Sequence, residues 1–268
     1  MLFIDANQYL QLYQTVTGRK LLAPLREQQG HVFITTQIVN EVHRNKLEIA
    51  SRFLQGQLQP LCLRAMGLPD HLFGIDERTL TEVRRRMASL SDDVTKLKNE
   101  LERLATETLG RISRSEDEVS VALEEVFRRA VQPTHEELER ARVRRELGNP
   151  PGKKGDPLGD QLSWEQFVSH AIGRPKLWVI SNDSDYLTTF GQTSFLNPLL
   201  LLDLQFVCGT LPEVYCFNNL MKGLEHFVHE SGLPRGSLPT GAEAAQIEED
   251  FLANYYCGNL VLSRIQGD

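Results

Sequence analysis

Short apolar runs alternate with amphipathic stretches over the first 60 residues of the chain. The runs "LFI" and "HVFIT" are typical of buried strands, whereas "NQYLQLYQTV", "KLLAPLREQQ" and "QIVNEVHRNKLEIASRFL" have the composition and spacing of helices. Thr35 or Thr36 is placed to cap the last of these helices. This order predicts a β-α-β-α beginning, which is typical of a parallel sheet covered by helices.

The pattern changes near residue 76 to a seven-residue repeat. Its apolar positions are Leu80, Val83, Met87, Leu90, Val94, Leu97, Leu101 and Leu104, and they predict one long helix packed along a seam. A second apolar stripe begins at Val119 after a capping-box spacing of Ser115 and Glu118, and a third helix is predicted between Thr134 and Gly148. We expect the first two helices to pair as a hairpin within the chain. The alternative is a coiled coil that dimerises the protein.

Alternating strands and helices resume after the loop "GNPPGKKGDPLG". Strands are predicted at "KLWVI" and "EVYCF", and helices at "DQLSWEQFVSHAI", "NPLLLLDLQF", "NNLMKGLEHFVHE" and "AEAAQIEEDFLANYY". Four apolar strands separated by helices predict an α/β fold with a central parallel sheet. We expect one domain over 1–268, with a helical insertion at 71–150 and a C-terminal helical extension at 229–268.

Composition narrows the class of protein further. The 268 residues are 41% hydrophobic, no apolar run approaches the roughly 20 residues that span a bilayer, and no basic leader is visible, so we expect a cytoplasmic protein without membrane contact. The net charge of -7 argues against nonspecific coating of nucleic acid. The four cysteines are too far apart for a Cys-x-x-Cys pair, which argues against a disulfide framework or a zinc ribbon.

Carboxylates follow the predicted strands. Asp5 comes directly after "LFI", Asp183 and Asp185 come after "KLWVI", and Glu41 lies one or two helical turns past "HVFIT". Asp160 stands at the start of the helix that leads into "KLWVI". In an open parallel sheet the ligand crevice lies beyond the carboxyl ends of the strands, so these acids can form one cluster.

Such a cluster has a specific chemistry. Ionised carboxylates held close together repel one another unless a cation sits among them or some are protonated, and oxygen ligands suit Mg²⁺ or Mn²⁺. A metal in a cleft activates water and neutralises charge on a phosphate, which indicates a phosphodiester substrate. Each acid also has a simpler interpretation: Asp5 and Asp160 as helix caps, Asp183 and Asp185 as turn residues, and Glu41 as a solvated residue. Their coincidence favours the site.

The segments "LFIDAN", "ITTQIVNEV", "GDQLSWE" and "ISNDSDY" resemble the PIN-domain family of metal-dependent nucleases, and "GNPPGKKGDPLGDQLSWEQF" is similar to larger bacterial PIN-like proteins with a helical insertion before the third acid. The resemblance covers about residues 1–55 and 150–228. It implies a Rossmann-like α/β/α sandwich and endoribonuclease activity with Mg²⁺ or Mn²⁺. The residues it implies are the catalytic, metal-binding Asp5, Glu41, Asp160 and Asp183, the additional ligand Asp185, and the supporting Asn7 and Asn182.

The sequence departs from the family pattern in two places. The insertion between Glu41 and Asp160 is much longer than in minimal members, so the resemblance implies no role for it. Asp156 also precedes the helix in "GDPLGD", and Asp160 is preferred because of the "GDQLSWE" match.

A basic segment leads into Asp160. Between positions 140 and 154 the local charge is +5, and the residues expected to contact substrate phosphates are Arg142, Arg144, Arg145, Lys153 and Lys154. The alternative is a solvated helix face paired with Glu137 and Glu139.

We therefore expect a divalent-metal-dependent endoribonuclease that cleaves single-stranded or structured RNA. Three alternatives remain: a DNA nuclease, a noncatalytic PIN-like module that binds RNA, and one that binds a protein partner through the helical hairpin. A haloacid-dehalogenase-like phosphatase is disfavoured because Asn7 stands where that class needs a second Asp, and the glycine-rich signature of a dinucleotide-binding protein is missing.

Overall fold

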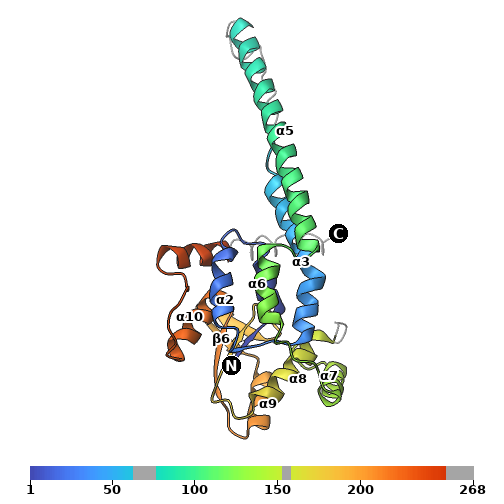
Figure 1. The fold of residues 1–268 in the computed structure, drawn as a ribbon, viewed down its shortest axis with the longest axis vertical. Coiled ribbons are helices and arrows are strands. Elements are labelled where there is room, and N and C mark those ends of the chain that lie inside the picture. The colour runs from blue at the N-terminus through green and yellow to red at the C-terminus, as the bar shows by residue number, and fades with distance from the viewer. Residues whose placement is uncertain (63–76, 153–157, 252–268) are drawn as a thin grey trace. The chain divides into compact units, whose positions relative to one another are not determined.

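A four-stranded parallel sheet forms the core of the computed structural model, which describes residues 1–62, 77–152 and 158–251 (Figure 1). The strand order is β2 (Val32–Phe33), β1 (Leu2–Ile4), β3 (Lys176–Ile180) and β6 (Glu213–Phe217). Every residue of β1 is fully buried, and its last residue pairs with the last residue of β3. The four strands are those that the sequence predicts.

Each face of the sheet is covered by its own helix. Phe3 of β1 lies 5.0 Å, between ring centroids, from Phe167 of α8 (Gly159–Ala171). On the opposite face, Trp178 of β3 lies 5.0 Å from Phe227 of α10 (Leu220–Glu230). Leu2 is the register partner of Trp178, and neighbouring strand residues point to opposite faces, so Phe3 and Trp178 belong to different faces. The predicted α/β fold with helices on both faces is confirmed.

The chain divides into two compact units. The first unit contains Met1–Lys46 and Glu118–Asp268, and the second contains Leu47–Asp117. These boundaries differ from the predicted insertion at 71–150, because α6 (Glu118–Phe127) and α7 (His135–Leu147) both belong to the first unit. There α6 packs on α2 (Leu22–Glu27), and Arg26 donates two hydrogen bonds of 2.7 and 2.8 Å to Glu125.

The second unit contains the last turns of α3 (Thr36–Leu58) and the long helix α5 (Glu77–Ser113). The two run side by side in Figure 1 and line one shallow groove, with Leu54 of α3 and Leu109 of α5 among its residues. The prediction that α5 pairs with the stripe that begins at Val119 is therefore wrong. That stripe is buried within the first unit instead, through Ala122, Leu123 and Val126.

The outer positions of the seven-residue repeat on α5 stay exposed. Val83, Leu90, Leu97 and Leu104 are each seven residues apart and each more than 40% exposed. The dimerising coiled coil that the sequence offers as the alternative stays a prediction.

Most of the predicted helix ends are found in the structure. Thr35 accepts a hydrogen bond of 3.2 Å from the Ile38 N–H and so caps α3. Thr134 and Glu137 form a capping box at the predicted start of α7, and the helix is followed by Gly148, which has a left-handed φ of 71°. The capping box at Ser115 is wrong, because α6 begins only at Glu118.

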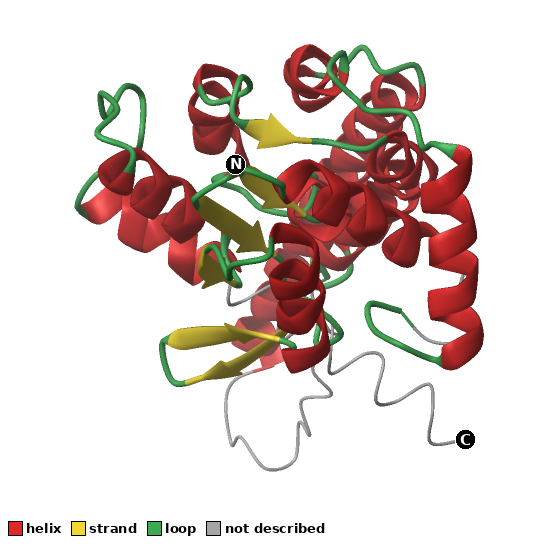
Figure 2. Cartoon of the chain, turned by 90° about the horizontal axis from the view of Figure 1, so that it is seen from below, coloured by secondary structure: helices red, strands yellow, loops and turns green. Residues whose placement is uncertain are grey.

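A β-hairpin that the sequence analysis missed follows β3. The strands β4 (Leu187–Phe190) and β5 (Thr193–Leu196) pair in antiparallel fashion outside the main sheet (Figure 2). Two residues join them, and Gly191 takes a φ of 61°, which is typical of two-residue hairpin turns. The threonines and phenylalanines on either side of that glycine were a usable signal.

The remaining elements of the first unit are short. They are α1 (Ala6–Gln11), the 3-10 helix η1 (Gly18–Leu21), α9 (Pro198–Cys208) and a helix at 242–251. The end of the predicted extension beyond 251 lies outside the described residues, as does Cys257. Among the described helices, none has both the length and the apolar content needed to span a membrane. Cys62, Cys208 and Cys216 are free thiols.

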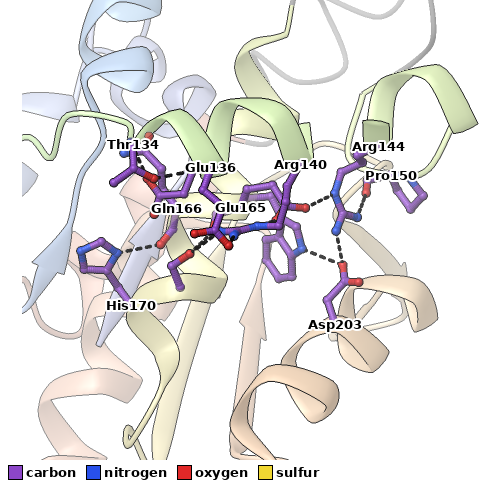
Figure 3. Close-up of polar contacts among 12 residues, drawn as sticks. Thr134, Glu136, Arg140, Arg144, Pro150, Glu165, Gln166, His170 and Asp203 are labelled. Carbon is purple, nitrogen blue, oxygen red and sulfur yellow. Dashed lines mark hydrogen bonds and ion pairs between the residues drawn. The ribbon is translucent and has the colours of Figure 1, made fainter. Parts of the chain in front are cut away.

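A buried ion-pair network fixes α8 between α7 and α9 (Figure 3). Glu165 of α8 accepts hydrogen bonds from the Nε atoms of Arg140, at 3.0 Å, and Arg144, at 2.7 Å. Arg144 also donates to Asp203 of α9 at 2.7 Å, and the Trp164 indole donates to the same carboxylate oxygen at 3.0 Å. Because the Arg144 and Glu165 side chains are 10% and 8% exposed, removal of one partner leaves a buried charge.

We expect Arg144→Met to destabilise the first unit by about 3 kcal/mol, since Glu165 keeps only Arg140 and Asp203 keeps only Trp164. The matched control is Arg142→Met on the same helix, whose half-exposed pair with Glu139 should be worth less than about 1 kcal/mol. Urea unfolding followed by tryptophan fluorescence measures this, because both tryptophans lie in the first unit. Equal effects of the two substitutions would contradict the network's structural role.

Candidate active site

Asp5 stands at the point where β1 ends and α1 begins. Its backbone N–H donates to the Ile180 carbonyl at 3.0 Å, which extends the β1–β3 ladder by one step. One carboxylate oxygen accepts from the Ala6 N–H and caps α1, and the other accepts from the Ser181 hydroxyl, both at 2.7 Å. The residue is 7% exposed. Asp5 is thus both a helix cap and a buried acid at the carboxyl edge of the sheet.

The loop after β3 brings a second acid to this edge. The Ser181 hydroxyl, which donates to Asp5, also accepts from the Asp183 N–H at 3.0 Å. Asp183 accepts from the Asp185 N–H at 2.8 Å, and its carbonyl accepts from the N–H groups of Tyr186 and Leu187. This turn fixes Asp183 beside Asp5 through one serine.

Two helices supply the other predicted acids. Glu41 lies on the second turn of α3, and Asp160 lies in the first turn of α8. The residue at the cap position of α8 is Leu158, so Asp160 is not the helix cap of the simpler interpretation. Asp156 lies outside the described residues.

The four carboxylates act on one another electrostatically. Burial raises the pKa of Asp5 to about 8, and the charges of Asp160, Glu41 and Asp183 add to this increase against the hydrogen bond from Ser181. Burial also raises the pKa of Glu41, where Asp183 adds to the effect and Arg44 opposes it. The other three predicted acids therefore lie close enough to Asp5, at the carboxyl edge of the sheet, for their charges to act on it.

A buried tyrosine, which sequence reasoning did not select, lies among these acids. The pKa of Tyr186 is raised well above its ordinary value, first by burial and then by Asp160, Asp5, Asp183 and Glu41. Its hydroxyl donates to the Asp160 carbonyl at 3.3 Å, and its ring packs 5.6 Å from Phe3. Tyr186 thus joins the turn after β3 to the start of α8. Its position directly after "NDSD" was the only sequence signal.

A protein-family model described as "PIN like domain" matches residues 1–185. The chain belongs to the PIN-like domain family. The matched segment contains β1, β2 and β3 of the sheet and all four acids. The family resemblance seen in the sequence is therefore confirmed. No curated protein and no solved structure matches the chain.

Asp185, the additional ligand that the PIN-like resemblance implies, contacts a loop instead. Asp185 is not among the charges that act on Asp5, and one of its oxygens accepts from the Gly152 N–H at 3.1 Å. Gly152 has a φ of 78° and lies so close to the side chain of Gln161 that a Cβ would collide with it. In this structure Asp185 therefore holds the loop before α8.

Two of the five predicted phosphate contacts already have acidic partners. Arg144 is committed to the buried network, and Arg142 pairs with Glu139. Arg145 is half-buried, and Lys153 and Lys154 lie outside the described residues. Asp203, for which the sequence indicated no function, is the acid that balances Arg144. Glu165 and Asp203 were missed because their arginine partners lie 21 and 59 positions away.

The donor set of the PIN-like site suits a hard divalent ion. Two buried side-chain oxygens beside the acids, Asn7 Oδ1 and Asn182 Oδ1, have no hydrogen-bond partner among the described residues. Within those residues, no three His, Cys, Asp or Glu side chains are spaced tightly enough to hold a metal directly. Mg²⁺ keeps several waters and takes only one or two carboxylates directly, so amide oxygens and water-mediated acids fit this arrangement.

The raised pKa of Asp5 predicts a pH-dependent stability. A carboxyl with a pKa of about 8 in the folded protein and an ordinary value of 3.8 in the unfolded chain takes up a proton when the chain folds between these two pH values. Its contribution to stability is therefore fully present below pH 4 and is lost as the pH rises toward 8. In a chelating buffer, the stability of the wild type should fall between pH 5 and 8 by at most about 1.4 kcal/mol per pH unit.

Asp5→Asn should remove this pH dependence, because an amide does not titrate. The measurement is the urea midpoint by tryptophan fluorescence at several pH values. Asp92→Asn, at an exposed position of α5 in the second unit, should follow the wild type. If the urea midpoints of wild type and Asp5→Asn changed with pH in the same way, Asp5 would not take up a proton on folding.

Proposed function

We propose that this PIN-like protein is a divalent-metal-dependent endoribonuclease. The observation that carries the proposal is that the charges of Asp5, Glu41, Asp160 and Asp183 all act on the same buried phenol, that of Tyr186. Helix capping accounts for Asp5 and a turn for Asp183, but neither accounts for four acids from separate parts of the chain near the crevice end of a parallel sheet, where ligands bind. Domains of this family are commonly nucleases, which makes a phosphodiester the best-supported substrate and RNA the preferred one.

The acids that would hold Mg²⁺ or Mn²⁺, one or two of them directly and the others through bound water, are Asp183, Glu41 and Asp160, with Asp5 at the buried end of the cluster. A divalent ion bound there supplies Lewis-acid activation of water and neutralises charge on the scissile phosphate. Ser181 fixes the Asp5 carboxylate and the Asp183 backbone, because its hydroxyl donates to the former and accepts from the N–H of the latter. Tyr186 stays neutral. Its hydroxyl donates a hydrogen bond to the backbone carbonyl of Asp160, which positions the first turn of α8.

Two neighbouring acids allow a sharp test of this assignment. Asp183→Asn should lower RNA cleavage by at least about 100-fold, the scale of removing one preorganised charge from an active site. Asp185→Asn should keep most of the activity, since an amide oxygen still accepts from the Gly152 N–H. The assay is cleavage of a single-stranded RNA pool by purified protein in Mg²⁺ or Mn²⁺, with EDTA as the metal-free control.

The outcomes separate the alternatives. Equal cleavage by wild type, Asp5→Asn and Asp183→Asn would indicate a contaminating nuclease or another site. Cleavage of DNA but not RNA would keep the enzyme class and replace the substrate. RNA binding without cleavage under any metal would favour the noncatalytic PIN-like module.

Metal binding can be measured without activity. Because an ion that binds only the folded protein stabilises it, Mn²⁺ at 100 times its Kd should stabilise the first unit by about 2.7 kcal/mol. Asp183→Asn should lose most of this stabilisation and Asp185→Asn should retain it. Tryptophan fluorescence in urea, with and without Mn²⁺, reports the difference. An equal Mn²⁺ effect on both variants would place the ion elsewhere.

A further inference from the structure

A pocket of about 610 Å³ opens beside the acidic cluster, within the first unit. Its size lies inside the range of about 300–1,000 Å³ that is usual for small-ligand sites. Five segments line it: the end of α1, the turn after β3, the β4–β5 hairpin, the start of α10 and the helix at 242–251. Ser181, which bonds to both Asp5 and Asp183, is part of the wall. The pocket and the acids therefore share one turn of the chain.

The lining consists mostly of amides and hydroxyls. The amide side chains are Gln11, Asn182, Gln192, Asn218 and Asn219, and the hydroxyls are Ser181, Ser184, Thr188 and Thr189. The two charged residues of the wall, Lys222 and Glu248, pair with each other at 3.2 Å. A phosphate would call for unpaired cations and a metal ion for carboxylates, so this lining suits a neutral ligand with several donors and acceptors.

One lining residue outside the proposed metal site carries an unsatisfied group. Gln11 is 8% exposed, and its Oε1 has no hydrogen-bond partner among the described residues. A buried acceptor without a donor is unfavourable by about 1–3 kcal/mol, so a ligand that supplies N–H groups would recover that free energy. The pairing edge of every nucleobase offers such N–H groups beside acceptors.

An exposed aromatic residue borders the same pocket. Phe190 stands between two lining residues, Thr189 and Gly191, and is 84% exposed. Aromatic rings at the surface are the usual stacking platforms for unpaired bases, worth about 1–3 kcal/mol per base. A base in the pocket and its neighbour on Phe190 would together orient a strand along the acidic edge.

We propose that this pocket binds one unpaired nucleobase of the RNA, so that the protein selects single strands and discriminates among bases near the cut. This proposal rests on the proposed nuclease function for the identity of the ligand. A paired base keeps its hydrogen-bonding edge inside the duplex, so double-stranded RNA cannot enter the pocket in this way.

The test uses a variant in which a large side chain on the β4–β5 hairpin fills the pocket. Thr188→Trp places a large side chain at an exposed, lining position of β4, where aromatic residues are well tolerated. The matched control is Thr193→Trp, an exposed threonine of β5 that lies on the same face of the hairpin and is not part of the lining. Unfolding curves of both variants show whether either substitution disturbs the fold.

Binding is measured first, without catalysis. The probes are AMP, GMP, CMP and UMP, each added to metal-free wild-type protein and followed by saturation-transfer NMR. We expect stronger transfer to base protons than to ribose protons, unequal affinities for the four nucleotides, and at least a tenfold loss in Thr188→Trp but not in Thr193→Trp. Equal binding of ribose 5-phosphate, or equal loss in both variants, would overturn the pocket assignment.

Cleavage is measured second, on a random single strand and on the same RNA annealed to its complement. Wild type should prefer the single strand at least tenfold and show one enriched base at a fixed distance from the cut, and Thr188→Trp should flatten that enrichment. Cleavage by wild type without any base enrichment would overturn this inference and leave the nuclease function standing. Nucleotide binding without cleavage of any RNA would instead overturn the nuclease function and keep the pocket.

Discussion

The pairing of β1 with β3 is the constraint on which the rest of the site depends. Ile4 is opposite Ile180 in the parallel ladder, so the residues that follow, Asp5 and Ser181, leave the sheet at the same level. A shift of one residue in this register would turn the side chains to the other face. The fully buried side chains of β1 oppose such a shift, because every one of them has a helix-covered face to fill. The packing of the core thereby determines where the acids stand.

The burial of Asp5 near other acids lowers the stability of the fold, and other interactions must compensate for this loss. Asp5 is buried among like charges, and its raised pKa shows that the folded protein disfavours its ionised form. The hydrogen bonds from Ala6 and Ser181 compensate part of this, and the hydrophobic contacts of Tyr186 and Phe3 hold the surrounding elements together. Local instability of this kind is expected at a site that binds a charged ligand. The ion pairs of Glu165 fix the middle of α8 and so contribute rigidity to the helix that carries Asp160.

The sequence predicted the parts of this structure that depend on local pattern. Apolar runs located the four strands, and the rule that ligands gather at the carboxyl ends of parallel strands was enough to choose Asp5 and Asp183. Sequence reasoning failed where contacts between distant parts of the chain determine the structure. The partner of α5 depends on where α3 ends, and the partners of Arg144 depend on how α8 and α9 pack. The hairpin at Gly191 was missed although its signal was local, because strands of four residues give too short an alternation to stand out from a loop.

The basic segment at 140–154 attracts a polyanion less strongly in the fold than its charge in the sequence suggests. As a sequence, residues 140–154 carry a charge of +5, which suggests long-range attraction. In the fold, Arg140, Arg142 and Arg144 each contact a carboxylate, so much of that charge is neutralised internally. Under the proposed function, a chain of net charge -7 would recognise RNA mainly through short-range contacts: a metal-bridged phosphate at the acids and hydrogen bonds to an unpaired base beside them. Such binding would depend less on counterion release than on the geometry of the pocket and the acids.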